Sequence, residues 1–141
     1  MNKSNVLFIL ATCFLILVLL LMLNNPLKII IKDSLNGEWV GKHKNSDVIL
    51  EIKKGNACSL KFNSDSSSKK ETFNGDCIVN MNKTPYSFII TNILEVNKSL
   101  YSLIKVINKD IIHISEFSTK WKLRPVIFTN ENTIILKRNI Y

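Results

Sequence analysis

Few side chains in this sequence have the type and spacing that chemistry requires. The two histidines, His43 and His113, are seventy residues apart, and neither stands in a Ser, Cys or Asp arrangement that suggests a catalytic relay. The carboxylates are isolated, although a closed sheet could bring Asp76 and Glu116 together from two expected strands. The four glycines are not spaced to cradle a phosphate. These patterns predict a protein that is not an enzyme and carries no cofactor.

The cysteines have a structural interpretation. Cys13 falls in an apolar run, whereas Cys58 and Cys77 fall on expected strands. No histidine lies near Cys58 or Cys77 at the spacing of a zinc site, so no metal site is predicted. In an oxidising compartment, a disulfide between them would close a loop of roughly 20 residues and stabilise the fold by about 3 kcal/mol. In the cytoplasm, both would remain buried thiols.

A third group lies at residues 121–125. Trp121 and Arg124 stand at a break between expected strands, and these two residue types are enriched where proteins bind their partners. They are therefore candidates for contact with a partner. The alternative interpretation is that Trp121 plugs one end of a barrel while Arg124 binds carbonyl groups of the loop.

The element that positions the whole chain is the apolar run 6–23. Its eighteen residues include no charge, glycine or proline. As a helix they would extend about 27 Å, close to the thickness of the hydrocarbon core of a bilayer. Within a bilayer, a helix is the only structure in which a single segment satisfies all of its own backbone hydrogen bonds. The run predicts one transmembrane helix. A cleaved signal peptide and a lipoprotein signal are the alternatives, but the run is too long for either and no small-residue cleavage site follows it.

The expected organisation is a membrane anchor at residues 1–26, a juxtamembrane linker at 27–35 and one folded domain at 36–141. The positive-inside rule compares the positive charges on the two flanks of the run, and these are nearly equal: Lys3 and the terminal amine on one side, Lys28 and Lys32 on the other. A short tail before a long apolar run is typical of a signal anchor. We therefore expect a single-pass protein of the plasma membrane, or an equivalent inner membrane, whose C-terminal domain is exported. The bilayer is the predicted partner of residues 6–23.

The net charge of +8 does not predict binding to nucleic acid. The cations are seventeen lysines and only two arginines, scattered along the chain without a long basic block. Arginine is the residue that reads bases and binds phosphates with two hydrogen bonds. A mild attraction to anionic lipid headgroups fits this charge better.

Beyond residue 37 the pattern changes to short runs rich in Ile, Val, Phe and Tyr, separated by polar turns. Alternating apolar positions predict eight or nine strands, with one helical turn or a loop at 118–124. The expected strands are 38–44, 48–52, 58–62, 73–79, 86–90, 100–107, 111–117, 126–128 and 133–138. No run is long enough for helical crossovers, so the fold class is all-β, an antiparallel meander. A closed or nearly closed barrel removes the two unpaired edges, and a sandwich is the second choice.

The first expected strand opens with Gly37-Glu38-Trp39. This motif resembles the Gly-x-Trp of lipocalins and related calycin barrels. The resemblance implies that the Trp closes one end of the barrel, with a basic residue of the last strand across its face. Arg138 or Lys137 would make that cation–π contact.

The expected function is a membrane-anchored, non-catalytic barrel that binds a lipid or another apolar ligand. Large inward residues favour a core that is filled by the barrel's own side chains. The candidates for ligand contact or packing are Trp39, Phe62, Phe88, Ile104, Phe117 and Arg138. The alternative is an accessory or assembly factor of a membrane protein complex. Trp121, Tyr101 and Tyr86 exposed on one face would favour that alternative.

Overall fold

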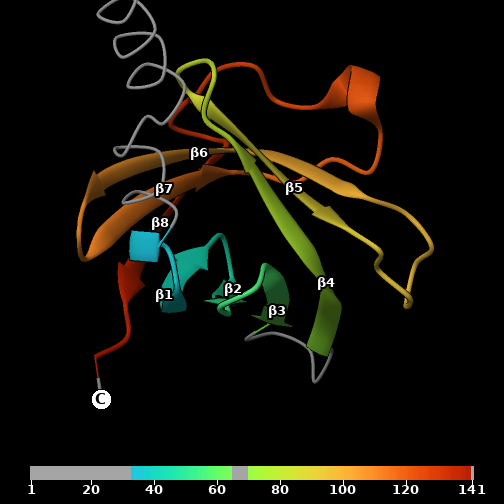
Figure 1. Ribbon diagram of the computed structural model, residues 1–141, viewed down its shortest axis with the longest axis horizontal. Helices are drawn as coiled ribbons and strands as arrows, with labels where there is room; N and C mark the ends of the chain where they lie inside the picture. The colour runs from blue at the N-terminus through green and yellow to red at the C-terminus, as the bar shows by residue number, and fades with distance from the viewer. Residues whose placement is uncertain (1–32, 65–69, 141) are drawn as a thin grey trace, which may run out of the picture. The chain divides into compact units, whose positions relative to one another are not determined.

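A computed structural model of the protein describes residues 33–64 and 70–140. These residues form eight strands and one short 3-10 helix (Figure 1). The elements are β1 (Gly37–His43), β2 (Ser46–Ile52), β3 (Ala57–Ser64), β4 (Lys70–Asn80), β5 (Tyr86–Thr91), β6 (Leu100–Asn108), β7 (Ile111–Ser115), η1 (Trp121–Leu123) and β8 (Thr133–Arg138).

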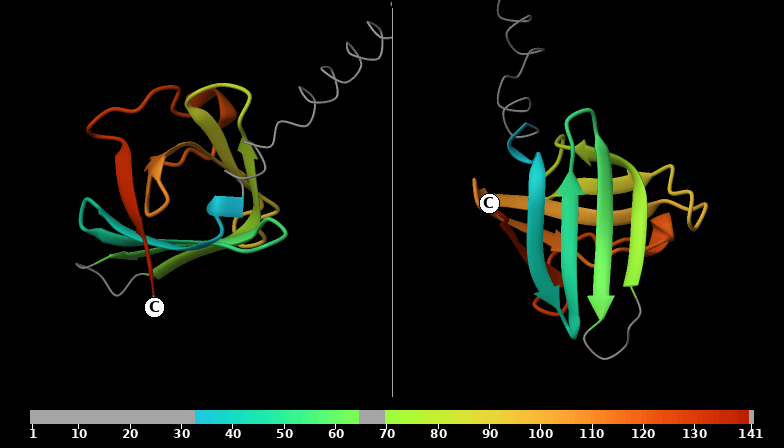
Figure 2. Two further views of the ribbon diagram at one scale, coloured as in Figure 1. Left: turned by 60° about the vertical axis from the view of Figure 1, so that its left-hand side comes forward. Right: turned by 90° about the horizontal axis from the view of Figure 1, so that it is seen from below.

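The eight strands form a closed antiparallel barrel in sequence order, so the barrel, and not the sandwich, is the architecture. Strand β8 closes the ring by pairing with β1, and Trp39 stands opposite Arg138 while Gly41 stands opposite Leu136. Figure 2 shows the strands arranged around a common interior. Closure leaves no free edge of the sheet for another chain to pair with.

The expected alternation of apolar residues directs one face of every strand into this interior. Its buried side chains come from all eight strands and form one cluster, in which Phe88 and Ile104 are fully buried. Large aliphatic side chains therefore fill the middle of the barrel. The strands, this core and the disulfide between Cys58 and Cys77 all lie within the described residues.

The two ends of the barrel differ. At one end lie the β2–β3, β4–β5 and β6–β7 turns and the entry to β1, where Leu35 is buried against the core. We call this the closed end. At the other end, the open end, lie the β1–β2 turn, the β3–β4 and β5–β6 connections and the long connection from β7 to β8.

The expected strand at residues 126–128 is wrong. Strand β8 already closes the sheet against β1, so these residues have no edge to join. Asn132 holds them as a loop, since its side chain accepts a hydrogen bond from the Thr129 N–H (2.8 Å) and donates one to the Ile127 carbonyl (3.2 Å). Within 118–124, η1 is the helical turn that was one of the two alternatives.

The predicted transmembrane run 6–23 and most of the linker lie outside the described residues. Over residues 33–64 and 70–140, none of the helical segments has the length and apolar character needed to cross a bilayer. Leu35, at the end of the expected linker, packs with the barrel core.

Gly41 is expected to be indispensable for closing the barrel. A Cβ atom at this position would lie 2.2 Å from the Ile135 carbonyl oxygen and 2.8 Å from a methyl group of Leu136. Because the obstacle is backbone, Gly41→Ala must push β1 and β8 apart, and we expect a loss of about 1–3 kcal/mol of unfolding free energy. Urea unfolding followed by circular dichroism measures it, and an unchanged midpoint would contradict so close an approach of the two strands.

Candidate functional site

The open end of the barrel holds a hollow of about 400 Å³. Five apolar side chains line it together with three polar ones that come from strand ends or the residue after β7. The lining residues are Phe62, Phe73, Leu100, Phe117, Ile134, His43, Glu71 and Glu116. A volume of this size falls within the range of about 300–1,000 Å³ that is usual for small-molecule sites.

Aromatic rings form much of the apolar lining. The rings of Phe62 and Phe73 meet edge to face with their centroids 6.4 Å apart, on the neighbouring strands β3 and β4. The Phe117 ring lies 6.0 Å from that of the fully buried Phe88. Phe117 therefore separates the hollow from the filled core, and a ligand here would contact rings on both sides without entering the middle of the barrel.

The polar part of the site centres on Glu116. Its carboxylate oxygen lies 2.7 Å from His43 Nε2 and 2.6 Å from Lys44 Nζ. The hydrogen bond from Lys44, and then that from His43, hold the pKa of Glu116 below its usual value, so the carboxylate is ionised at neutral pH. Because an ionised carboxylate only accepts hydrogen bonds, the Nε2–H of His43 is the donor in the hydrogen bond to Glu116.

Five of the eight side chains that line the hollow are apolar, which is typical of a small-molecule binding site. The lining contains no Ser, Cys or Thr that His43 could activate as a nucleophile. Among residues 33–64 and 70–140, no three His, Cys, Asp or Glu side chains gather closely enough to hold a metal ion. Asp76, which the sequence allowed to approach Glu116, accepts a hydrogen bond from Asn92 instead (2.6 Å), while Glu116 binds His43.

The closed end is built around Trp39. The Arg138 guanidinium carbon lies 4.1 Å from the centroid of the Trp39 ring, so Arg138, and not Lys137, makes the cation–π contact. The indole N–H of Trp39 donates to the Leu35 carbonyl (2.8 Å), and Arg138 donates to the Asn36 carbonyl (2.7 Å). These bonds tie the segment before β1 to the last strand, so they close this end of the barrel.

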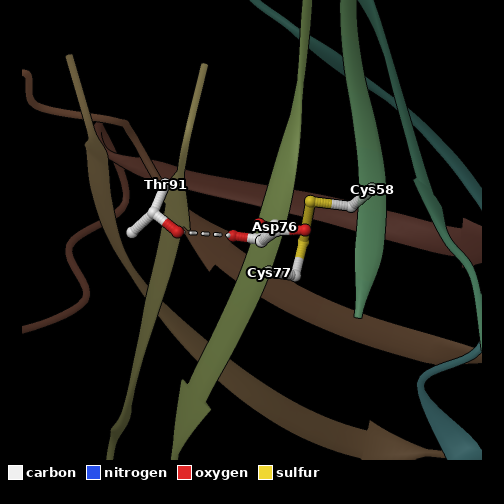
Figure 3. Close-up of a disulfide and its surroundings, with 4 residues drawn as sticks. All are labelled: Cys58, Asp76, Cys77 and Thr91. Carbon is white, nitrogen blue, oxygen red and sulfur yellow. Dashed lines mark hydrogen bonds between the residues drawn. A yellow bond between two sulfur atoms is a disulfide. The ribbon is translucent and has the colours of Figure 1, made fainter. Parts of the chain in front are cut away.

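Cys58 and Cys77 form a disulfide, the pairing that the sequence left open. It joins the neighbouring strands β3 and β4 on their inner face, with the two Cα atoms 5.8 Å apart (Figure 3). On the other side of β4, the Thr91 hydroxyl donates to the Asp76 carbonyl. The disulfide is therefore part of the wall of the barrel, outside the lining of the hollow.

Trp121 does not plug an end of the barrel. It lies on the outer side, where its ring meets that of Tyr101 edge to face (5.3 Å between centroids) and carries the Arg124 guanidinium at 3.5 Å. Arg124 also donates to the Trp121 carbonyl (2.9 Å), so its expected bond to a loop carbonyl is present. Tyr86 is absent from this face, because its side chain packs against the core.

The structure divides the six predicted ligand or packing residues among three places. Phe62 and Phe117 line the hollow, Phe88 and Ile104 are core residues beneath it, and Trp39 with Arg138 is at the closed end. The sequence did not single out the other lining residues as site residues, namely His43, Glu71, Phe73, Leu100, Glu116 and Ile134. Most stand at or near a strand end that reaches the open end, and this position is the signal by which they could have been found.

Comparisons with protein-family models, with curated proteins and with solved structures found no match to this chain.

Proposed function

We propose that the protein is a membrane-anchored, non-catalytic barrel of the lipocalin-like kind that binds an apolar ligand at its open end. The observation that carries the proposal is the aromatic hollow of about 400 Å³ above a filled core. In this proposal, residues 6–23 hold the barrel at the membrane. The ligand enters from the end opposite to the one that Trp39 and Arg138 close.

The lining indicates the chemical class of the ligand. The rings of Phe62, Phe73 and Phe117 suit a flat or branched apolar body. Two carboxylates, Glu71 and Glu116, stand among the lining residues, and Glu116 is held ionised. The charge of Glu116 is compensated by its ion pair with Lys44. The site therefore suits an apolar ligand, with polar groups confined to the rim formed by His43 and Glu116.

Two features away from the hollow support the lipocalin-like and exported parts of the proposal. The Gly-x-Trp motif opens β1, and its Trp39 receives a basic residue of β8, as the resemblance implies. The disulfide is stable in an oxidising environment and uncommon in a reducing cytoplasm. It therefore supports a barrel on the far side of the membrane.

Native mass spectrometry on residues 33–141, purified without detergent, tests whether the hollow is occupied. We expect a constant additional mass that disappears on denaturation and identifies the class of ligand. A bare monomer mass, combined with no binding of added apolar probes, would contradict the proposal.

Phe117→Ala should weaken the binding of an apolar fluorescent probe such as N-phenyl-1-naphthylamine by about tenfold, since the ring supplies a large part of the apolar contact. Titration of probe fluorescence measures the dissociation constant. Ile135→Ala is the matched control, because this half-exposed side chain of β8 is not among the lining residues. Equal affinities for both variants and the unchanged protein would place the binding site elsewhere.

A further inference from the structure

The connection from β7 to β8 exposes an unusual number of large apolar side chains. Trp121 is 48% exposed, Leu123 68%, Val126 66% and Ile127 63%. Single exposed apolar residues are ordinary, but a contiguous group of them marks a contact surface. We call residues 120–127 the 120–127 surface.

The 120–127 surface is held in place by the barrel. The backbones of Tyr101 and Ser118 exchange two hydrogen bonds, of 2.8 and 2.9 Å, so the start of the connection is fixed to β6. Further along, the Trp121 ring stands against that of Tyr101, and the Arg124 guanidinium lies over the indole ring. The apolar side chains are therefore presented on a preformed support, and little order has to be gained on binding.

The charges of this surface have one sign. Lys120, Lys122 and Arg124 alternate with Trp121 and Leu123, and no Asp or Glu occurs between residues 117 and 130. Beside them lies a groove of about 460 Å³ between η1 and the β4–β5 turn. Lys83 and Arg124 both line this groove, and none of its lining residues is acidic. A partner that fits must combine negative charge with an apolar interior.

We propose that the 120–127 surface docks on an anionic lipid bilayer. Leu123, Val126 and Ile127 would enter the boundary between headgroups and acyl chains, and the indole of Trp121 would lie at headgroup level, where Trp is enriched. Lysine stems extend along apolar surface and hold their ammonium groups among the lipid phosphates. The groove beside Arg124 and Lys83 accommodates one anionic headgroup.

A bilayer suits this surface better than a protein partner. The cations alternate residue by residue with the apolar side chains, so they meet a surface of evenly spread negative charge without needing matched carboxylates. The proposal adds a second membrane contact to the one predicted at residues 6–23, and it does not depend on any ligand in the hollow. The β4–β5 turn that borders the groove belongs to the same end of the antiparallel strands as the entry to β1.

Tryptophan quenching by brominated lipids tests the proposal on the full chain in nanodiscs. The chain has two tryptophans, and Trp39 is buried, so the difference between the protein and its Trp121→Phe variant isolates the emission of Trp121. We expect strong quenching of Trp121 in nanodiscs of phosphatidylcholine with phosphatidylglycerol. Quenching should be weaker with phosphatidylcholine alone, and added salt should reduce it in the anionic nanodiscs.

Lys120→Gln with Lys122→Gln should lower the docking equilibrium constant by about thirtyfold, from the usual attraction of each lysine to an anionic surface. Lys105→Gln with Lys137→Gln removes the same charge from exposed positions on β6 and β8 and should leave quenching unchanged.

The proposal would be overturned if Trp121 is not quenched, or if its quenching depends neither on lipid charge nor on Lys120 and Lys122. If Trp121 becomes less accessible as the protein concentration rises, and not as lipid is added, its partner would be a protein and not the bilayer. Failure of the full chain to co-elute with uncharged nanodiscs would instead reject the predicted anchor.

Discussion

Trp39→Ala is expected to lower the free energy of unfolding by about 3–5 kcal/mol, the range for removing a large aromatic side chain from a core. Trp39 is almost completely buried, and it is the platform on which Arg138 stacks. The truncation would also leave the buried Leu35 carbonyl without its hydrogen-bond donor. Urea unfolding monitored by circular dichroism gives the difference without depending on the tryptophan signal.

The matched control is Trp121→Ala, the same substitution at the only other tryptophan. Trp121 is half-exposed, and its ring contacts the side chains of two partly exposed neighbours, Tyr101 and Arg124. Its loss should therefore cost about 1 kcal/mol or less. If Trp39→Ala fails to fold, Trp39→Phe keeps most of the apolar contact while removing the N–H, and a partial loss is then expected. Equal costs at the two positions would contradict the closed end described above.

Removing both halves of the disulfide, by Cys58→Ala with Cys77→Ala, should destabilise the barrel by about 3 kcal/mol. The bond joins residues 19 positions apart, and its loss frees this loop in the unfolded chain. Unfolding of the unmodified protein in the presence of a reducing agent should show a comparable loss. The double variant itself should be insensitive to the reducing agent.

Cys13→Ala provides the control for the cysteine chemistry, because it leaves Cys58 and Cys77 in place. Its unfolding midpoint should equal that of the unmodified protein and should still respond to the reducing agent. Mass spectrometry of the unmodified protein after alkylation, without prior reduction, should find at most one reactive thiol, that of Cys13. Alkylation of Cys58 and Cys77 in the folded, unreduced protein would contradict the disulfide.

Both of these large effects concern structure and not the proposed binding site. The disulfide and the Trp39 platform lie away from the residues that line the hollow. A variant that survives with reduced stability should therefore retain its probe affinity. Phe117→Ala should lose probe affinity in addition to the stability that its ring contributes by packing against the core. This separation makes loss of ligand distinguishable from loss of fold.

The sequence by itself determined the strands and the face that each one buries. In β2, Val48, Leu50 and Ile52 occupy alternate positions, and in β5 Phe88 and Ile90 do the same; all five side chains are buried. This worked because side chains of a strand point to opposite faces in turn, so a local pattern suffices. The barrel followed from strand number and spacing, because a meander of this size removes its unpaired edges by closing.

Only the tertiary structure decided how distant residues meet. His43 and Glu116 are 73 residues apart, and they touch because closing the barrel brings the end of β1 beside the segment that follows β7. The same closure left residues 126–128 without an edge, so an apolar run that resembles a strand became an exposed loop. Local alternation specifies which face is buried, but strand order, register and closure fix which strand ends share a site. The hollow depends on these long-range pairings, and for that reason the sequence pattern did not predict it. At the 120–127 surface the pattern singled out Trp121 and Arg124, but the groove beside them depends on the tertiary structure.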